Sequence, residues 1–442
     1  MSVSRQRKYE NLPASGNIIL GAGMSGLALG AVSGLPVYEA AAGPGGICSS
    51  YYLKPGTAKR LPRAPEDGNS YRFEYGGGHW IFGASPAVLR FVRSLTPLKS
   101  YKRRSGVYFS RQDLYVPYPL QGHLGCLNKE LAAKASQELA ASAAGDPETL
   151  ADWIKSSFGW TLTKLFFGPF HERYTAGLWR SIAPQDAYKS PAATGKAARA
   201  KASSAGYNAG FFYPAEGLNV LSGRLAESCR IFYGKKAVRL DVRKRSVGFA
   251  DGSHTRYERL ISTLPLNRMI ELTGLRTGSP ADPYTSVLVL NIGAARGPRT
   301  PDAHWLYIPD SRAGFHRIGF YSNVDGSFLP APFRAGGERT GIYVERAYPG
   351  GARPSENEIG VYSRKVVREL QEWGFIGKVE ALDATWIDVA YTWSRPGSKW
   401  RSRAIKALEE KGIYQIGRYG RWAFQGIADS IRDGLIAGKT FR

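Results

Sequence analysis

The stretch NIILGAGMSGLALGAVSGLPVYEAAAGPGG, residues 17–46, decides the fold of this chain. It opens with a short apolar run, Ile18–Leu20, of the kind that forms a buried parallel strand. Gly21, Gly23 and Gly26 follow in the pattern G-x-G-x-x-G. The first glycine of this pattern allows a sharp turn, the second lets a pyrophosphate approach the backbone, and the third lets the helix pack closely on the strand. The pattern therefore predicts a strand, a turn and a helix that bind a dinucleotide.

The rest of the stretch adds a second strand and an acidic residue. Pro36–Tyr38 is expected to start the strand, and Glu39 ends it 18 residues after Gly21. A carboxylate at that place can accept hydrogen bonds from the hydroxyl groups of an adenosine ribose. Met24 and Ser25 begin the expected helix, whose N-terminus offers free N–H groups and a positive dipole end to phosphates.

Two other interpretations of this stretch fit it less well. A glycine-rich turn occurs in many α/β proteins, but here a strand precedes the motif, a helix follows it and an acid stands at the expected distance. Residues 18–38 are mostly apolar, yet five glycines, two serines and a proline make a poor lipid-facing helix. Dinucleotide binding is therefore the prediction.

Length and cysteine content narrow the class of protein. A chain of 442 residues can bury a large core and is expected to hold two or three sub-domains. The three cysteines, Cys48, Cys126 and Cys229, match no metal or redox spacing, so we expect reduced thiols, no metal site and a cytoplasmic protein. The start of the chain lacks a secretory signal, and we expect no transmembrane segment.

The formal net charge of +24 points toward anionic partners. The positive residues are scattered, with denser groups at 102–104, 196–201 and 239–245. No aromatic-interleaved basic repeat and no helix-turn-helix pattern occurs, so we expect no specific recognition of nucleic acid. A basic, solvated surface that attracts phosphorylated substrates is the favoured interpretation, and a dedicated polyanion site is the alternative.

Beyond the opening stretch the chain alternates between helical and strand-rich regions. Alanine-rich or amphipathic patterns predict helices at 129–143, 147–158 and 162–180. A small, basic segment, AATGKAARAKASSAG, follows and suits either a mobile lid or a plain linker. Residues 284–295 and 304–347 are rich in strand-forming residues. The end of the chain reads as a strand, a glycine-bearing loop and a last helix, an arrangement that can hold part of a dinucleotide.

Several segments, taken in order, make the chain resemble the UDP-galactopyranose mutases, especially their eukaryotic-type branch. They are GGGHWIFG, YVPYPLQGHL, FFGPF, YNAGFFYP, DGSHTRYERLISTLP, HWLYIPDSRAGFHRIGFYSN and GRYGRW, spread over about residues 15–440. The wider relatives are the protoporphyrinogen and amine oxidases, which share the FAD domain. The resemblance implies that the cofactor is FAD, and the pair Gly45 and Gly46 after the ribose acid favours FAD over NAD in the same way.

The resemblance also implies a fold class and a division into domains. The fold is expected to be α/β, with a discontinuous FAD-binding Rossmann domain, an inserted helical region and a mixed or antiparallel sheet that binds substrate. The expected FAD-binding domain comprises residues 15–95, 207–275 and 405–442. The helical region with its mobile loop is expected at 123–206, and the substrate sheet at 96–122 and 276–404.

The activity implied by the resemblance is redox-neutral. Reduced FAD acts as the nucleophile on the anomeric carbon of a nucleotide sugar, and the sugar ring opens and closes again in the other size, as in UDP-galactopyranose and its furanose form. NAD(P)H or another reductant would reduce the flavin, and a homo-oligomer is compatible with the family. This chemistry needs few protein acids or bases, which suits a chain without an evident catalytic triad or metal cluster.

The family roles carry over to individual residues. His79 matches the histidine beside the flavin, with a structural histidine as the alternative, and Arg317 matches the arginine that grips the diphosphate, with a surface salt bridge as the alternative. The cofactor-binding set is Gly21, Gly23, Met24, Ser25, Gly26, Glu39, Gly45, Gly46, Gly417 and Arg418. The substrate-binding set is Tyr118, Gln121, Lys189, Asn208, Trp305, Tyr307, Arg317 and Arg395.

The chain departs from the family pattern where the family holds the diphosphate. Three tyrosines of the family are replaced, at positions that align with Val324, Arg395 and Phe424. The second phosphate-binding arginine has Lys189 as its nearest counterpart. A tyrosine hydroxyl donates one neutral hydrogen bond, whereas Arg395 would bring a charged fork. The sugar, the base or the leaving group is therefore open.

Two other functions compete with the mutase. An FAD-dependent oxidase or dehydrogenase of the protoporphyrinogen or amine oxidase type would take hydride from its substrate and pass electrons to oxygen or a quinone. A polyanion-binding protein on a retained flavin fold would bind nucleic acid or lipid in a salt-dependent way, without flavin turnover.

Overall fold

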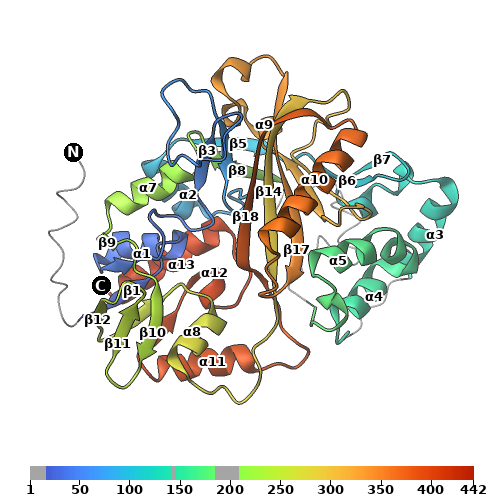
Figure 1. Ribbon diagram of the computed structural model, residues 1–442. Coiled ribbons are helices and arrows are strands. Elements are labelled where there is room, and N and C mark those ends of the chain that lie inside the picture. The colour runs from blue at the N-terminus through green and yellow to red at the C-terminus, as the bar shows by residue number, and fades with distance from the viewer. Residues whose placement is uncertain (1–15, 142–145, 185–208) are drawn as a thin grey trace.

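The computed structural model describes residues 16–141, 146–184 and 209–442. Two β-sheets form its frame, one parallel and one largely antiparallel, and a group of helices lies on the far side of the second sheet (Figure 1). The fold is the α/β class expected from the sequence, with a mixed second sheet. Within the described residues no helix is both long and apolar enough to cross a membrane.

The parallel sheet collects strands from distant parts of the chain. Its order is β19-β13-β1-β2-β9, and every neighbouring pair is parallel. The five strands therefore come from the first, middle and last parts of the chain, as a discontinuous domain requires. Their bounds are β1 Ile18–Leu20, β2 Val37–Tyr38, β9 Ile231–Phe232, β13 Leu260–Ser262 and β19 Ile413–Gln415.

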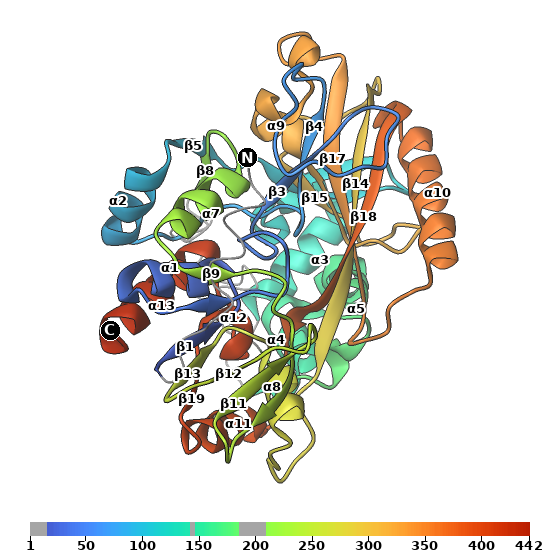
Figure 2. The same ribbon diagram turned by 60° about the vertical axis from the view of Figure 1, so that its left-hand side comes forward.

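Helix α1 (Met24–Ser33) follows β1 and packs against the last helix, α13 (Ile427–Thr440), as both views show (Figures 1 and 2). The last helix expected at the end of the chain is present as α13. Gly434 allows the close approach, because a side chain there would collide with the backbone of Ser25. The two ends of the chain are thus joined through their helices.

The second sheet has the order β18-β14-β17-β16-β15-β6-β7 and is mixed, because β15 pairs with β6 in parallel and the other pairs are antiparallel. Helix α10 (Glu356–Glu372) covers one face with a buried apolar stripe. The opposite face turns toward the parallel sheet and the helical region. The strands are β6 Ser105–Phe109, β7 Leu114–Pro117, β14 Tyr284–Arg296, β15 Trp305–Tyr307, β16 Arg317–Phe320, β17 Arg339–Pro349 and β18 Ile376–Thr392.

The helical region contains α3 (Lys129–Ala140), α4 (Leu150–Leu162) and α5 (Gly168–Tyr174), all beside the second sheet. The expectation of one continuous helix over 162–180 is wrong. A π-helical turn at Thr163–Phe167 precedes α5, and the helix ends where the following residues, among them Ala176, take positive φ angles. A left-handed backbone cannot continue a right-handed helix.

Smaller elements join these layers. Strands β3 and β4 pair with each other, β5 pairs with β8, and β10, β11 and β12 form a three-stranded sheet. Their bounds are β3 Ser50–Leu53, β4 Tyr71–Glu74, β5 Leu98–Lys102, β8 Gly210–Pro214, β10 Ala237–Asp241, β11 Ser246–Phe249 and β12 His254–Arg256. The remaining helices are α2 Pro86–Leu95, α7 Leu218–Glu227, α8 Leu266–Thr273, α9 Tyr321–Val324, α11 Trp400–Glu409 and α12 Gly417–Gly420.

Candidate functional site

A cavity of about 1140 Å³ extends from the parallel sheet to the second sheet. One end is lined mainly by backbone from α1 and from glycine-bearing loops, and we call it the glycine end. The other end is lined by His79, Trp80, Arg317, Tyr391 and Phe424, and we call it the arginine end. Eleven residues expected at the cofactor or catalytic site line this cavity: Gly21, Gly23, Met24, Ser25, Glu39, Gly45, Gly46, His79, Arg317, Gly417 and Arg418.

The glycine end is shaped by the absence of side chains. Gly23 stands before α1 and has no side-chain cap, and a Cβ built on it would meet no atom within 4 Å. Gly26 does not line the cavity but packs against the turn, because a Cβ built on Gly26 would collide with the carbonyl oxygen of Gly21. The free N–H groups of the first turn of α1 thus face an open space that suits a pyrophosphate.

Glu39 stands at the end of β2, where the ribose-binding acid was expected. Its Oε2 accepts a hydrogen bond of 2.6 Å from the N–H of Ala22, and its Oε1 accepts one of 2.8 Å from the N–H of Ala41. These bonds fix the carboxylate beside the glycine turn. Gly45 is held against the same turn, since its N–H donates to the Ala22 carbonyl over 2.8 Å.

The three glycines Gly76, Gly77 and Gly78 are required by packing at the arginine end. A Cβ on Gly77 would lie 2.9 Å from Oε1 of Glu345, and a Cβ on Gly78 would collide with the hydroxyl of Tyr343. Gly77 also has a φ of +76°, which favours glycine. The glycine run therefore lies directly on strand β17, and it carries His79 at its end.

His79 lies in the cavity wall and is partly buried. Its Nδ1 has no hydrogen-bond partner among the described residues. Burial, with the positive charge of Arg418 nearby, lowers the pKa of His79 to about 4. The imidazole is therefore neutral at physiological pH.

Arg317 is held by a carboxylate on the second sheet. Its Nε and Nη2 donate to Glu345 over 3.0 and 2.6 Å, and Glu345 is 2% exposed. Burial alone would raise the pKa of Glu345, but Arg317 and His316 outweigh burial and lower it to about 2. The pair is charged, with Glu345 buried and Arg317 partly buried, and one edge of the guanidinium is used by Glu345 while Arg317 also lines the cavity. A clamped guanidinium of this kind can present its remaining edge to an anion.

Arg418 lies between the two ends of the cavity. It donates to the carbonyls of Gln425 (2.9 Å) and Ala390 (3.1 Å), and its guanidinium lies 4.6 Å from the centre of the Phe424 ring. Tyr391 is also close, with its ring centre 5.4 Å from the same group. These contacts place a fixed positive charge beside His79 in a wall that is otherwise aromatic.

The expected substrate residues on the second sheet form an aromatic group next to the main cavity but outside its lining. Tyr118 and Tyr307 have ring centres 4.6 Å apart, and Trp305 meets Phe82 of the cavity wall at 6.3 Å. Tyr118 lines a second cavity of about 800 Å³, together with Lys102–Arg104 and Arg299. Gln121 lies beside Tyr118 in a short 3-10 turn, Leu120–Gly122.

The replaced tyrosine positions fall in three different environments. Arg395 is half-exposed outside the main cavity, donates to the carbonyl of Ala281 over 2.9 Å and lies 3.9 Å from Asp282. Val324 is buried in the hydrophobic core, and Phe424 lines the cavity. The remaining expected substrate residues, Lys189 and Asn208, lie outside the described residues.

Sequence reasoning missed several residues of the site. Glu345 could have been found from the sequence, because it is the single acid of strand β17 and directly follows the apolar residues Ile342–Val344. A charged side chain that is buried in such a strand needs a partner of opposite charge. Tyr391 near the end of β18 and the half-exposed Val238 on β10 carry no comparable signal. Their place in the cavity wall depends on how β10 and β18 pair with their neighbouring strands.

The cavity fits a flavin dinucleotide in its shape and in its donor set. The glycine end offers an open cradle at a helix N-terminus with an acid nearby, and the arginine end offers the neutral ring of His79 in the cavity wall. The residues that would hold the group are those of the glycine end, together with the loop before α13 at Gly426. In the described ranges no three histidine, cysteine, aspartate or glutamate side chains gather as they would around a metal ion.

The chain is similar in fold to several solved structures. The crystal structure of a reduced UDP-galactopyranose mutase matches with a TM-score of 0.79 and 20% identity over 96% of this chain and 94% of that one. A putative protoporphyrinogen oxidase from Exiguobacterium matches with a TM-score of 0.67 and 13% identity, over 97% and 98% of the two chains. A redesigned putrescine oxidase matches with a TM-score of 0.59 and 14% identity, over 97% and 99%.

At these identities the structural matches establish a shared fold. The family model described as flavin containing amine oxidoreductase matches residues 35–437, nearly the whole chain. The chain belongs to the flavin containing amine oxidoreductase family.

Proposed function

We propose that the protein is a flavin-dependent mutase that interconverts ring forms of a nucleotide sugar, with UDP-galactopyranose and its furanose form as the model substrates. When bound in its reduced state, FAD would supply the nucleophile for the anomeric carbon. The observation that carries the proposal is Arg317: a guanidinium held by buried Glu345 that lines the same cavity as His79 and the glycine cradle.

The arginine end supplies what a leaving nucleoside diphosphate needs. Arg317 would bind phosphate oxygens with the edge that Glu345 leaves open, and Arg418 adds a second positive charge. A diphosphate stabilised in this way can leave the sugar and return to it without a proton donor. Trp305, Tyr307 and Tyr118 form an aromatic group beside the cavity that would suit a nucleoside.

Neutral His79 would contribute a hydrogen bond rather than a charge. Its depressed pKa keeps the ring uncharged between pH 5 and 8, so the ring would accept or donate a hydrogen bond according to its tautomer. The buried, aromatic wall around it would exclude water from the reacting sugar.

An FAD-dependent oxidase is the second candidate, and one observation favours it. Phe424 lines the cavity where a hydroxyl was expected, and Arg395 lies outside the cavity, so the anion site has fewer donors than the family pattern predicts. An apolar wall of this kind also suits an uncharged substrate that transfers hydride.

The two functions are separated by the redox state they require. The holoenzyme, reduced with dithionite under anaerobic conditions, is incubated with UDP-, GDP- and dTDP-sugars in pyranose and furanose forms, and ring isomers are followed by chromatography. The mutase predicts isomerisation by the reduced enzyme alone. Flavin reduction by an amine or another reductant substrate under air, with no isomerisation, would establish the oxidase instead.

A variant of Arg317 tests whether this residue binds the diphosphate of the nucleotide. Arg317→Lys keeps a positive charge beside Glu345 but loses the planar fork, so we expect weaker nucleotide binding with the flavin retained. Unchanged nucleotide binding in this variant would contradict the role of Arg317. Arg395→Lys serves as the matched control, since Arg395 lies outside the cavity.

A further inference from the structure

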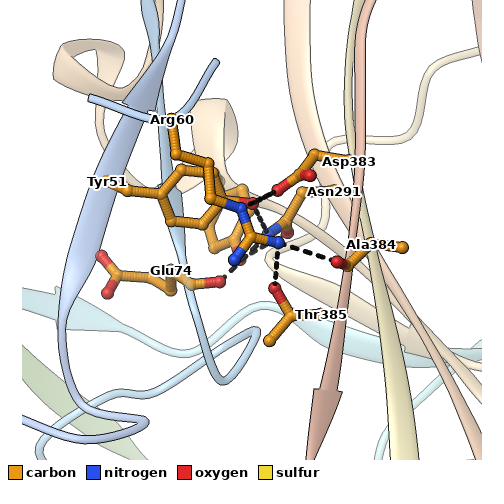
Figure 3. Close-up of polar contacts among 8 residues, drawn as sticks. Tyr51, Arg60, Glu74, Asn291, Asp383, Ala384 and Thr385 are labelled. Atoms are coloured by element: carbon orange, nitrogen blue, oxygen red, sulfur yellow. Dashed lines mark hydrogen bonds and ion pairs between the residues drawn. The ribbon is translucent and has the colours of Figure 1, made fainter. Parts of the chain in front are cut away.

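Asn291 on β14 is the centre of a buried polar network that joins the second sheet to the segment before His79. The side chain is fully buried and lies between β4 and β18 (Figure 3). Its Nδ2 donates to the hydroxyl of Tyr51 over 2.9 Å and to the main-chain carbonyl of Glu74 over 3.0 Å. Its Oδ1 accepts a hydrogen bond of 3.0 Å from the hydroxyl of Tyr321. All three partners are buried, so the amide is saturated in one orientation.

The orientation of this amide is imposed from outside the cavity. Arg60 donates to Asp383 over 2.8 Å, and also to the carbonyl of Ala384 and the hydroxyl of Thr385. Asp383 in turn accepts a short hydrogen bond from Tyr51. Because Tyr51 gives its proton to the carboxylate, its oxygen can only accept from Asn291. The N–H groups of the amide must therefore face Tyr51 and Glu74.

The Glu74 carbonyl is the point where the glycine run begins. It accepts from Asn291 and, over 3.4 Å, from the N–H of Gly77, so one oxygen is shared by the network and the first turn of the run. Figure 3 shows this carbonyl facing Asn291, with the Glu74 carboxylate on the opposite side. The run then passes over Tyr343 and Glu345 and delivers His79 to the cavity.

The register of the second sheet puts these contacts in one row. Asn291 is paired with Asp383 on β18 and with Tyr343 on β17, and Tyr343 is paired with Gly319 on β16. The same row thus fixes the glycine run at its start, through Asn291, and near its end, through Tyr343. A shift of the Glu74 carbonyl would move His79 relative to Arg317, because Arg317 is held in place on strand β16 of the second sheet.

We propose that Asn291 is a positioning residue: it holds the Glu74 carbonyl, and through the glycine run it sets where His79 stands against the bound flavin. The role concerns the flavin site of the family and does not depend on which substrate the enzyme takes. Asn291 touches neither the cavity nor a ligand within it, and acts only through the main chain.

The test compares two variants that disturb the same amide from different sides. Asn291→Asp keeps the size of the side chain but turns an acceptor toward the Glu74 carbonyl. Tyr321→Phe removes the bond to Oδ1 and leaves the bond to Glu74 in place. Purified holoenzymes are compared by the visible spectrum of bound FAD, by FAD release in a dilution series, and by thermal unfolding.

We expect Asn291→Asp to raise the FAD dissociation constant about tenfold or more and to change the shape of the flavin absorption band. Tyr321→Phe should change the FAD dissociation constant less than twofold while its unfolding temperature falls. Asn291→Leu serves as a second variant if the aspartate is neutralised by a proton. A native flavin spectrum and native FAD retention in both Asn291 variants would overturn the proposal. So would FAD loss that only follows the fall in unfolding temperature in all three variants.

Discussion

The two ends of the main cavity are built in different ways. The glycine end is made of main chain: the first turn of α1, the pair Gly45 and Gly46, and the loop at Gly417. The arginine end is made of side chains, and its Arg317 is paired with the buried carboxylate of Glu345. The first end is therefore suited to a pyrophosphate through its main chain, whereas the chemistry of the second end changes with each substitution.

The difference shows where specificity lies. A backbone cradle fails only when a side chain fills it or breaks its turn. A side-chain wall fails when one partner of a buried pair is removed, because the remaining charge is left without compensation. Substitutions at the two ends should therefore fail for distinct reasons, and the following variants test this in order of expected effect.

At the glycine end, Gly26→Ala should abolish FAD binding. Its Cβ would collide with the Gly21 carbonyl, so α1 cannot pack on β1 as the turn requires. Gly23→Ala is the matched control, because its Cβ would meet no protein atom within 4 Å. That control should fold with a native unfolding temperature and lose only FAD affinity, measured by flavin absorbance after gel filtration. A yellow, fully loaded Gly26→Ala protein would contradict the account.

At the arginine end, Arg317→Ala should lower the free energy of unfolding by about 3–5 kcal/mol, the usual result of leaving a buried charge unpaired. The loss should shrink at low pH, where Glu345 can take up a proton. Combining Arg317→Met with Glu345→Gln should recover most of the stability but no nucleotide binding. Urea denaturation at two pH values measures both effects. If Arg317→Ala alone is as stable as the parent chain, the pairing of Arg317 with Glu345 does not stabilise the fold.

Glu74 provides a test through the pH dependence of stability. Its carboxyl is buried and accepts hydrogen bonds from Ser50 and Tyr213, and burial raises its pKa from 4.5 to about 7. The folded protein therefore binds this proton more tightly than the unfolded chain does. The contribution is complete below pH 4.5 and is lost as the pH rises toward 7, on the order of 3 kcal/mol in all.

Glu74→Gln should remove this pH dependence. The difference in unfolding free energy between the parent and the variant, measured from pH 4.5 to 8, isolates Glu74 from His79, whose lowered pKa acts in the opposite direction. A difference that stays constant across this range would show that Glu74 keeps an ordinary pKa.

The smallest effect is expected for Arg395→Ala. Arg395 is half-exposed and 3.9 Å from Asp282, and such pairs contribute little to stability, about 0–1 kcal/mol. Because Arg395 lies outside the cavity, UDP affinity should change less than twofold in calorimetric titration. A tenfold loss of UDP affinity would restore Arg395 to the substrate site.

Much of the fold was predictable because its signals are local. The run Ile18–Leu20, the glycines after it and Glu39 are close in sequence, so periodicity and spacing were enough. The helix expected over 162–180 failed because the break comes from left-handed backbone at Ala176 and its neighbour, where composition still favours a helix. The parallel pairing of β15 with β6 joins residues far apart and has no local signal.

The site was predicted less completely, for a similar reason. His79, Arg317 and the glycine set carry motifs, and the structure brings all of them except Gly26 into the lining of one cavity. Asn291 and Tyr391 are ordinary residues of long strands, and their importance comes from strand register and from neighbours on other strands. Arg395 was expected in the substrate site from its aligned position, but its side chain lies outside the main cavity.

The most direct test of the account is a crystal structure of the reduced holoenzyme with UDP. The account predicts the FAD pyrophosphate at the N-terminus of α1, His79 beside the flavin ring and the UDP diphosphate on Arg317, which keeps its bonds to Glu345. A structure in which FAD binds as described but UDP avoids Arg317, or binds elsewhere, would contradict the assignment of the arginine end and the mutase with it.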